Sequence, residues 1–143
     1  MLTLARVTAA DVVYDLGSGD GRIPIAAARK YGARGVGIEI DPALVEEARA
    51  NAKAAGVDRL VEFRLQNALT ADISPATVVT LYVLASGNAK LRPLLTRQLR
   101  PGARIVSHQF PMGDWAPARS VRLAVDGREH VLHLWIVPPR AAR

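Results

Sequence analysis

The chain has 143 residues, of which 50% are hydrophobic and 22% charged, with a net charge of +6, and this composition suits one globular domain. It has no cysteine, which excludes disulfide scaffolds, zinc–thiolate sites, iron–sulfur clusters and cysteine nucleophiles. No apolar run reaches the about 18 residues of a membrane span, and the start lacks a signal peptide's apolar region, so we expect a soluble cytoplasmic protein.

Apolar runs alternate with helical stretches along the first half of the chain. The pattern predicts strands at residues 12–16, 35–39 and 60–65 and helices at residues 23–31 and 42–55. Gly32 suits the end of the first helix. Asp41 and Pro42 suit the cap and the first turn of the second, which is the clearest helix in the sequence.

The second half continues the alternation and then changes to a hairpin. It predicts strands at residues 77–83, 104–110, 121–125 and 130–137, and a helix at residues 90–99. Pro93 leaves the start of that helix open. Asp126 and Gly127 separate the last two strands and favour a two-residue turn.

This order of elements predicts one α/β domain over residues 1–143. The units β-α-β-α-β and β-α-β imply a Rossmann-like, doubly wound, mostly parallel sheet with helices on both faces. Sheets of this kind bind ligands at the carboxyl ends of their strands, near the point where the strand order reverses. The loop after the first strand is therefore the place to expect a site.

That loop is rich in glycine and is flanked by two carboxylates, Asp15 and Asp20. Gly17, Gly19 and Gly21 allow a sharp turn and a close approach of the backbone to a ligand. The spacing is G-x-G-x-G, whereas a dinucleotide site has G-x-G-x-x-G. A pyrophosphate would also be repelled by both carboxylates, which better match a ligand with an amino group and a sulfonium.

The second strand ends in an acidic residue, Glu39. Neighbouring parallel strands place Glu39 beside the glycine loop, where its carboxylate can accept hydrogen bonds from both hydroxyls of a ribose. Ile40 follows and can lie against an adenine face.

Taken together, these motifs resemble class I methyltransferases that use S-adenosylmethionine (SAM). Residues 13–21 resemble their motif I, residues 37–42 their second motif, and residues 65–68 their third, in which Asn67 replaces the usual Asp. The resemblance extends from residue 11 to residue 137 and implies a seven-stranded sheet with an antiparallel C-terminal hairpin. It implies contacts to the methionyl end of SAM from Asp15, Gly17, Ser18, Gly19 and Gly21, to the ribose from Glu39, and to the adenine from Asn67 and Ala68.

The acceptor side carries fewer signals. No Asn/Asp-Pro-Pro-Tyr run follows the fourth strand, which disfavours methylation of exocyclic amino groups. Residues 73–113 contain no Asp or Glu, so no metal site is expected there, and the spacing of His130 and His133 puts them on opposite faces of a strand. Trp115 either walls an acceptor pocket or packs beneath the loop.

Residues 107–115, together with Tyr82, resemble a narrower group of small prokaryotic methyltransferases. This group is distantly similar to the lysine methyltransferases that modify membrane-embedded mitochondrial proteins. Those relatives usually have an additional N-terminal segment, so we expect a minimal catalytic core here. The candidates for a general base are His108, Tyr82 and Asp114, with His108 preferred because histidine titrates near neutral pH.

We therefore expect a SAM-dependent methyltransferase whose acceptor is a small molecule or a protein lysine, through an oxygen or nitrogen nucleophile. The alternatives are a SAM-binding module without catalysis and a nucleotide-binding oxidoreductase. Residues 76–143 carry 10 basic and 3 acidic side chains, a net of +7, which favours an anionic partner. The few aromatic residues disfavour nucleic acid. Coding bias toward arginine also explains the charge, and the oligomeric state stays open.

Overall fold

The computed structural model describes residues 1–81 and 85–139, and of residues 85–89 only the backbone. In this part of the chain, seven strands form one sheet. The strands are β1 (Val12–Leu16), β2 (Arg34–Glu39), β3 (Val61–Leu65), β4 (Val78–Leu81), β5 (Arg104–His108), β6 (Arg119–Val125) and β7 (Arg128–Ile136). The helices are α1 (Arg22–Tyr31), α2 (Pro42–Ala54) and α3 (Ala85–Gln98), with a short 3₁₀ helix, η1 (Ala68–Thr70).

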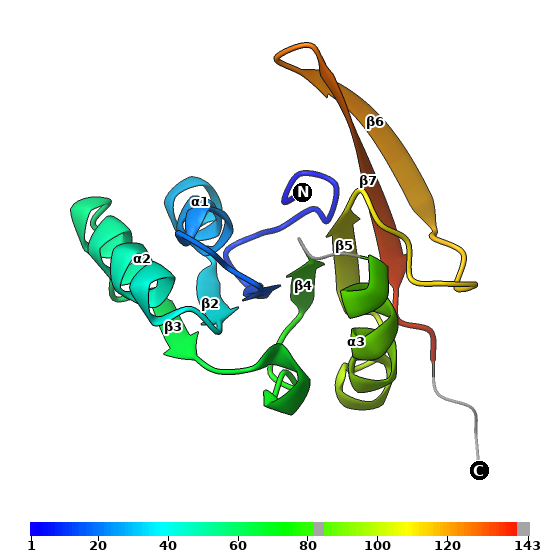
Figure 1. Cartoon of the computed structure of the whole chain (residues 1–143), viewed down its shortest axis with the longest axis horizontal. Coiled ribbons are helices and arrows are strands. Elements are labelled where there is room, and N and C mark those ends of the chain that lie inside the picture. Colours follow the sequence, from blue (N-terminus) through cyan, green and yellow to red (C-terminus); the bar gives the residue numbers. More distant parts are fainter. Residues whose placement is uncertain (82–84, 140–143) are drawn as a thin grey trace.

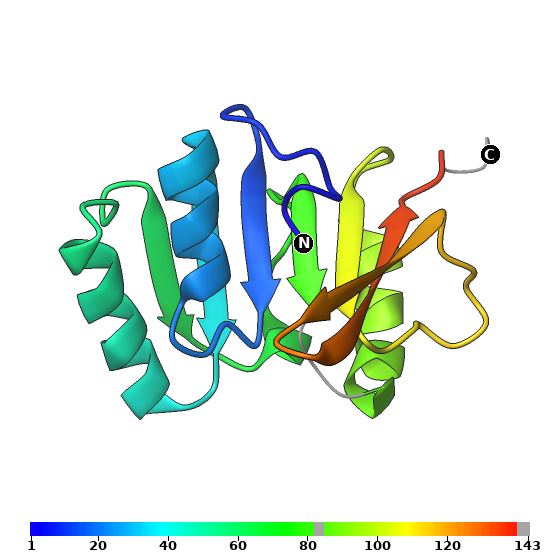
Figure 2. The ribbon, with the colours of Figure 1, turned by 90° about the horizontal axis from the view of Figure 1, so that it is seen from above.

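The strand order is β3-β2-β1-β4-β5-β7-β6 (Figures 1 and 2). Strands β1 to β5 are parallel, whereas β7 runs antiparallel to both β5 and β6. The predicted mostly parallel, seven-stranded sheet with a C-terminal antiparallel hairpin is therefore confirmed. The chain first builds outward from β1 to β3 and then returns to β4, so the order reverses between β1 and β4, the place where such sheets bind ligands.

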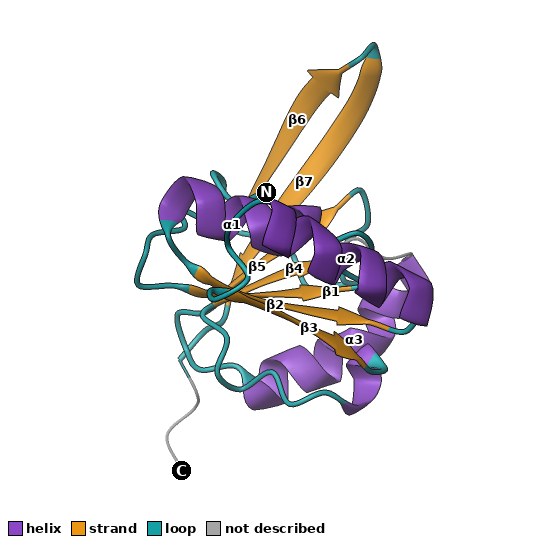
Figure 3. Ribbon diagram, turned by 90° about the vertical axis from the view of Figure 1, so that its left-hand side faces the viewer, coloured by secondary structure: helices purple, strands orange, loops and turns teal. Residues whose placement is uncertain are grey.

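Helices cover both faces of the sheet, as Figure 3 shows. Helices α1 and α2 lie together on one face and α3 lies on the other. Packing follows the alternation of the strands: in β1, Val13 contacts the α1 side, whereas Tyr14 and Leu16 belong to the core on the α3 side. Leu95 of α3 and Trp135 of β7 are fully buried in that second core.

The caps of the first two helices follow the sequence signals. Gly32 ends α1 with a left-handed φ of 71°. Asp41 caps α2 through a hydrogen bond from the Ala43 amide to its side chain, 2.9 Å long, and Pro42 takes the first helical position. The predictions for both helices are thus confirmed to within a residue at each end.

Several predicted boundaries in the second half were wrong, and β6 and β7 each begin two residues before the predicted start. Helix α3 begins at Ala85 instead of residue 90, so Pro93 lies inside the helix, although a proline there removes one backbone hydrogen bond. Strand β5 ends at His108 because Gln109 adopts a positive φ of 71°, which breaks the extended chain before Phe110. The end of the predicted fourth strand, residues 82–83, lies outside the described residues.

The β6–β7 hairpin projects beyond the layered part of the molecule (Figures 1 and 3). Its turn has positive φ at both Asp126 (51°) and Gly127 (74°), as the two-residue hairpin turn predicted from this dipeptide requires. None of the helices in the described ranges is long and apolar enough to span a bilayer.

Candidate functional site

The loop between β1 and α1 is held against the end of β2 by backbone hydrogen bonds. The amides of Gly17 and Ser18 both donate to the Ile38 carbonyl, at 2.8 and 3.1 Å. Gly17, Gly19 and Gly21 all have positive φ, between 56° and 87°. The predicted sharp turn therefore exists, and it lies where the strand order reverses.

Two of these glycines serve different needs. A Cβ atom on Gly21 would lie 2.6 Å from the Phe63 ring and 3.1 Å from the Ala48 Cβ, so this glycine is required for packing between the loop, α2 and β3. A Cβ on Gly19 would meet nothing within 4 Å. Gly19 thus faces open space. In the protein without ligand, only its left-handed φ of 56° disfavours a larger residue at this position.

Glu39 joins the glycine loop to the start of α2. Its Oε1 accepts a hydrogen bond from the Gly19 amide at 2.9 Å, and its Oε2 accepts from the amides of Ile40 and Asp41 at 2.9 and 3.0 Å. Its carboxylate is buried, and Oε1 retains a lone pair for a further donor. The predicted closeness of Glu39 to the loop is confirmed.

Asp15 lies deeper in the same site. It is buried, and Thr80 of β4 donates a hydrogen bond to its Oδ1 at 2.7 Å. Burial raises the pKa of Asp15 to about 7; the Thr80 hydrogen bond opposes this shift, and the negative charge of Glu39 adds to it. Asp15 is therefore a carboxyl group whose charge changes near neutral pH.

A cavity of about 440 Å³ lies at this loop. Its lining includes Met1, Asp15, Gly17, Ser18, Gly19, Asp20, Arg22 and Ile23. The Ser18 hydroxyl is buried and has no hydrogen-bond partner among the described residues. A buried hydroxyl without a hydrogen-bond partner lowers the stability of the fold unless a ligand or a water molecule supplies that partner.

Residues beyond the loop form an exposed apolar surface at the ends of β2 and β3. Ile40 is 68% exposed, and Leu65 and Leu69 are also exposed. Asn67 follows β3, and its side-chain carbonyl accepts a hydrogen bond from the Leu69 amide at 2.9 Å, which caps η1. The second lone pair of that carbonyl is available to another donor. Ala68 is half-buried beside it.

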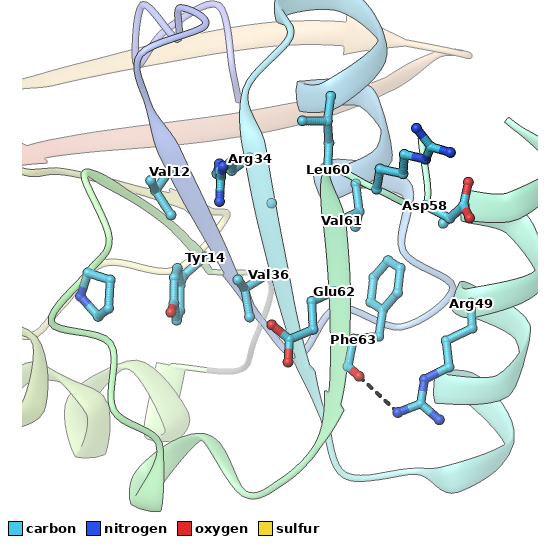
Figure 4. A pocket seen from close by; sticks show the side chains of 14 residues that line it. Val12, Tyr14, Arg34, Val36, Arg49, Asp58, Leu60, Val61, Glu62 and Phe63 are labelled. Carbon is cyan, nitrogen blue, oxygen red and sulfur yellow. Dashed lines mark hydrogen bonds between the residues drawn. The ribbon is translucent and has the colours of Figure 1, made fainter. Parts of the chain in front are cut away.

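A larger hollow, of about 670 Å³, lies along β1, β2 and β3, away from the glycine loop. Figure 4 shows it along β1, β2 and β3, where Tyr14, Val36 and Glu62 lie on the sheet face opposite α1 and α2. Figures 1 and 2 show that α3, the helix on that side, lies by β5 and away from β2 and β3. The hollow lacks the glycine loop and both buried carboxylates, so its size reflects an uncovered sheet face and not a built ligand site.

His108 lies on the same face of the sheet as Asp15. Asp15, Thr80 and Val106 are in register across β1, β4 and β5, and His108 is two residues beyond Val106, toward the carboxyl edge. Burial lowers the pKa of His108, and repulsion from His130 and from the amino group of Met1 lowers it further. Met1 also lines the loop cavity.

Asp114, another candidate base, is engaged with a residue of α3. Asp114 forms an ion pair with Arg92 of α3, which lowers the pKa of Asp114 and keeps it a carboxylate that is 92% exposed. Tyr82 lies outside the described residues. Trp115 packs against Trp135, whose ring N–H donates to the Trp115 carbonyl at 2.8 Å, so it packs beneath the loop.

One contact on the acceptor side was missed from the sequence. His130 of β7 makes a hydrogen bond with His108, 2.7 Å between His130 Nδ1 and His108 Nε2. His133 points to the opposite face and contacts Ser120, as the strand alternation predicted. Only the pairing of β5 with β7 could have indicated the His108–His130 contact. In the described ranges, no three His, Asp or Glu side chains converge as a metal site would need.

Comparison with known proteins decides the family. The family described as the ANTKMT methyltransferase domain matches residues 15–119, from Asp15 through β5 to the start of β6. The chain belongs to this family. It is a SAM-dependent methyltransferase, and its cofactor is SAM.

The match covers most of one similar protein and only half of another. A protein-lysine N-methyltransferase of Saccharolobus islandicus is 39% identical over 138 residues, which are 96% of this chain and 86% of that protein. The adenine nucleotide translocase lysine N-methyltransferase of Mus musculus is 35% identical over 115 residues, 80% of this chain and 50% of that protein. The chain thus spans about half the length of this vertebrate relative.

A solved structure agrees closely with the fold. The crystal structure of an RNA methyltransferase from Salinibacter ruber, in complex with S-adenosylhomocysteine, has 59% sequence identity and a TM-score of 0.93. The match covers 99% of this chain and 90% of that one. The nucleotide-binding oxidoreductase alternative receives no support from these comparisons.

Proposed function

We propose that this chain methylates the side-chain amine of a lysine in a protein acceptor. The observation that carries the proposal is the His108–His130 pair at the carboxyl edge, on the face that holds the glycine loop. A lysine is protonated at neutral pH and must lose a proton before its nitrogen can attack. The Saccharolobus relative, named a protein-lysine methyltransferase, supports the same acceptor.

We assign the cofactor to the glycine-loop cavity. The buried Ser18 hydroxyl, the open space at Gly19 and the carboxylates of Asp15 and Glu39 suit a ligand with hydroxyl and ammonium donors. Gly17 and Gly21 shape the loop around it. Asp15 and the loop would hold the methionyl end and Glu39 the ribose hydroxyls.

At the other end, the exposed face of Ile40 would cover one side of the adenine. Asn67 and Ala68 would border its edge, with the second lone pair of the Asn67 carbonyl toward the amino group. When bound, SAM supplies a methyl group already activated by the sulfonium. The chain's own residues therefore mainly have to orient the acceptor nitrogen and remove its proton.

His108 is the residue we assign to this proton transfer. The acceptor N–H bond breaks, an N–H bond forms on the imidazole, and the electron pair stays on the acceptor nitrogen as its nucleophile. The lowered pKa keeps His108 neutral and able to accept a proton near pH 7. Asp114 is occupied by Arg92 and Tyr82 is outside the described residues, so neither enters this assignment.

RNA is the second candidate acceptor. The Salinibacter neighbour is named an RNA methyltransferase, and residues 76–143 carry a net charge of +7. A basic surface of this kind also suits an acidic protein.

Transfer of a labelled methyl group from SAM separates the two acceptors. The chain would be incubated with mixed cellular protein and RNA, followed by protease or ribonuclease digestion and analysis of the label. We expect protease-sensitive label that elutes as methyl-lysine. Ribonuclease-sensitive label alone would replace the lysine proposal by the RNA one. Glu39→Gln, which we expect to weaken cofactor binding, is the negative control.

A further inference from the structure

Strand β6 ends the sheet, and one of its two sides is not covered by any described strand. On the other side it pairs with β7 in a regular register that ends at Val125 and Arg128. These two residues close the two-residue turn and exchange hydrogen bonds, and such pairs alternate along the ladder with pairs that do not. The N–H and C=O groups of Ser120, Arg122 and Ala124 therefore point away from β7. These main-chain groups form the open edge of β6, which can receive a further strand.

The side chains on one face of β6 are apolar at three positions and basic at the fourth. Arg119, Val121, Leu123 and Val125 share this face because side chains alternate along a strand. Leu123 and Val125 are 43% and 51% exposed, and Val121 is half-buried. Arg119 is exposed and has no ion-pair partner among the described residues, whereas Arg122, on the other face, forms an ion pair with β7. This face therefore matches a partner strand with several apolar residues and a carboxylate at one end.

The same face of β6 is continuous with the acceptor side of the sheet. Val121 is opposite Leu132 of β7, and Leu132 is opposite His108 of β5. Leu123 is opposite His130, which makes the hydrogen bond with His108. The hairpin projects on the side of the sheet that carries α1 (Figures 1 and 3). A strand added at the open edge thus extends the face on which we place the base.

We propose that the open edge of β6 docks an extended segment of the protein acceptor by strand addition. The segment runs antiparallel to β6, since antiparallel pairing is the more stable and continues the hairpin. Main-chain hydrogen bonds hold it, its apolar side chains pack beside Leu123 and Val125, and its carboxylate pairs with Arg119. The inference rests on the proposed function, because it names how that acceptor is held, and it adds a binding surface outside the cofactor cavity.

Charge favours an acidic segment over a second copy of this chain at the open edge. Residues 76–143, which include the whole hairpin, carry 10 basic and 3 acidic side chains, so these halves of two copies repel each other. A second copy would also bring its own Arg119 to the edge. An acidic segment instead supplies the counter-charge that Arg119 lacks among the described residues.

The direction of the segment also indicates where the methylated lysine lies. The turn of the hairpin is beyond the carboxyl end of β5, because His108 is opposite Leu132 and β7 begins at Arg128. Strand β6 runs toward this turn, so an antiparallel segment enters there and leaves near Arg119. The lysine is therefore N-terminal to the docked segment, at the edge of the sheet that holds the glycine loop.

Amide hydrogen exchange measured by NMR tests the docking without an identified acceptor. The probe is the peptide Val-Thr-Val-Thr-Val-Thr-Glu, blocked at both ends, whose glutamate is opposite Arg119 in antiparallel pairing. Its addition to the full chain should slow exchange at Ser120, Arg122 and Ala124, while the alternate amides of β6, which already face β7, should change little. No slowing, or equal slowing along β6, would overturn the proposal. Slow exchange at the same three amides without peptide, increasing with protein concentration, would place a second copy there and would also overturn it.

Two variants separate the main-chain contacts from the charge. Ala124→Pro removes an N–H that faces away from β7, so thermal unfolding should show a retained fold and peptide affinity should fall about tenfold. Arg119→Glu should weaken the peptide by about threefold to tenfold, and lysine in place of the peptide's glutamate should restore binding to this variant. Arg59→Glu, the same change at an exposed residue before β3, is the matched control. An equal loss of affinity in Arg59→Glu would contradict the pairing with Arg119.

Kinetics distinguish the docking from the proposed function. With an acceptor protein identified by its methyl-lysine, Ala124→Pro should raise KM for that protein and leave kcat and the dissociation constant for SAM unchanged. An unchanged KM, with methyl-lysine as the product, would overturn the docking and leave the proposed function standing. Ribonuclease-sensitive label alone in the transfer experiment would overturn the proposed function, and with it a protein acceptor as the occupant of the open edge.

Discussion

At the scale of single residues, Glu39 combines two roles that the sequence presents as one. The sequence predicts that it binds a ribose. The structure adds that its carboxylate accepts hydrogen bonds from the backbone amides of Gly19, Ile40 and Asp41. Removing a buried acceptor of three N–H groups costs roughly 1–3 kcal/mol for each group left without a partner. Glu39→Ala therefore perturbs the loop as well as the cofactor site.

Glu39→Gln is the milder change, because its amide oxygen can still accept the hydrogen bonds from Ile40 and Asp41, although its NH2 group then faces the Gly19 N–H. Loss of charge-assisted hydrogen bonds, each worth roughly 1.5–3 kcal/mol, should weaken SAM binding by about one to two orders of magnitude. Calorimetric titration measures this affinity, and thermal unfolding shows whether the loop has survived. An unchanged dissociation constant would remove Glu39 from the cofactor site.

Gly19 and Gly21 form a matched pair of substitutions. Gly21→Ala should lower the free energy of unfolding, because its Cβ strikes Phe63 and the left-handed backbone adds about 1–2 kcal/mol of strain. Gly19→Val adds only the backbone strain, yet its side chain would enter the space assigned to the cofactor. We expect Gly19→Val to fold and to lose SAM binding. Bound cofactor in crystals of Gly19→Val, in the same loop, would contradict this assignment.

Asp15 makes stability depend on pH. Its pKa is about 7 in the folded chain and 3.8 without burial, so the folded state binds more protons between these values. The folded state should therefore lose stability as pH rises from about 4 to 7, by up to about 4 kcal/mol, and lose no more above pH 7.

Asp15→Asn, which mimics the protonated group, isolates this contribution. Chemical unfolding at several pH values should show the wild type losing stability relative to Asp15→Asn over that window. Parallel curves would mean that Asp15 is already charged in the folded chain at pH 4.

At the scale of elements, the sequence best predicts the loops, caps and turns whose conformation is set by neighbouring residues. The glycine loop, the cap of α2 and the Asp126–Gly127 turn were each predicted from short motifs, because each depends on a few neighbouring residues. The start of α3 and the end of β5 were not, since burial of the neighbouring Leu94 and Leu95 favours the helix despite Pro93, and hydrogen bonds with β7 hold Gln109.

The candidate site divides in the same way. Asp15, Glu39 and the loop could be placed from the sequence, because parallel neighbouring strands end at one edge. The His108–His130 contact could not, because it depends on the register of two strands that are 20 residues apart in the chain. Neither could the ion pair between Asp114 and Arg92, which joins a loop to the opposite helix layer.

At the scale of the whole molecule, positive charge is concentrated in the half of the chain that follows β3 and η1. Residues 76–143 have a net charge of +7, and they include β5, β6, β7 and α3. If this half attracts an anionic acceptor, its KM should rise steeply between about 50 and 200 mM salt, because bound screening ions are released on association. The affinity for SAM, measured over the same range, is the control and should change little. A KM independent of salt would favour a small neutral acceptor.

The position of β6 at the end of the sheet has a further consequence. Among the described residues it pairs only with β7, so the backbone groups along its other side can template the addition of a strand from a second molecule, the first step of aggregation. Leu123 and Val125 are exposed on this strand and would strengthen such an association. Arg119 places a like charge in every strand that would stack there, and this repulsion opposes fibril growth, whereas the charge of Arg122 is paired with Glu129 of β7. We therefore expect Arg119 to oppose the association of separate molecules through this edge.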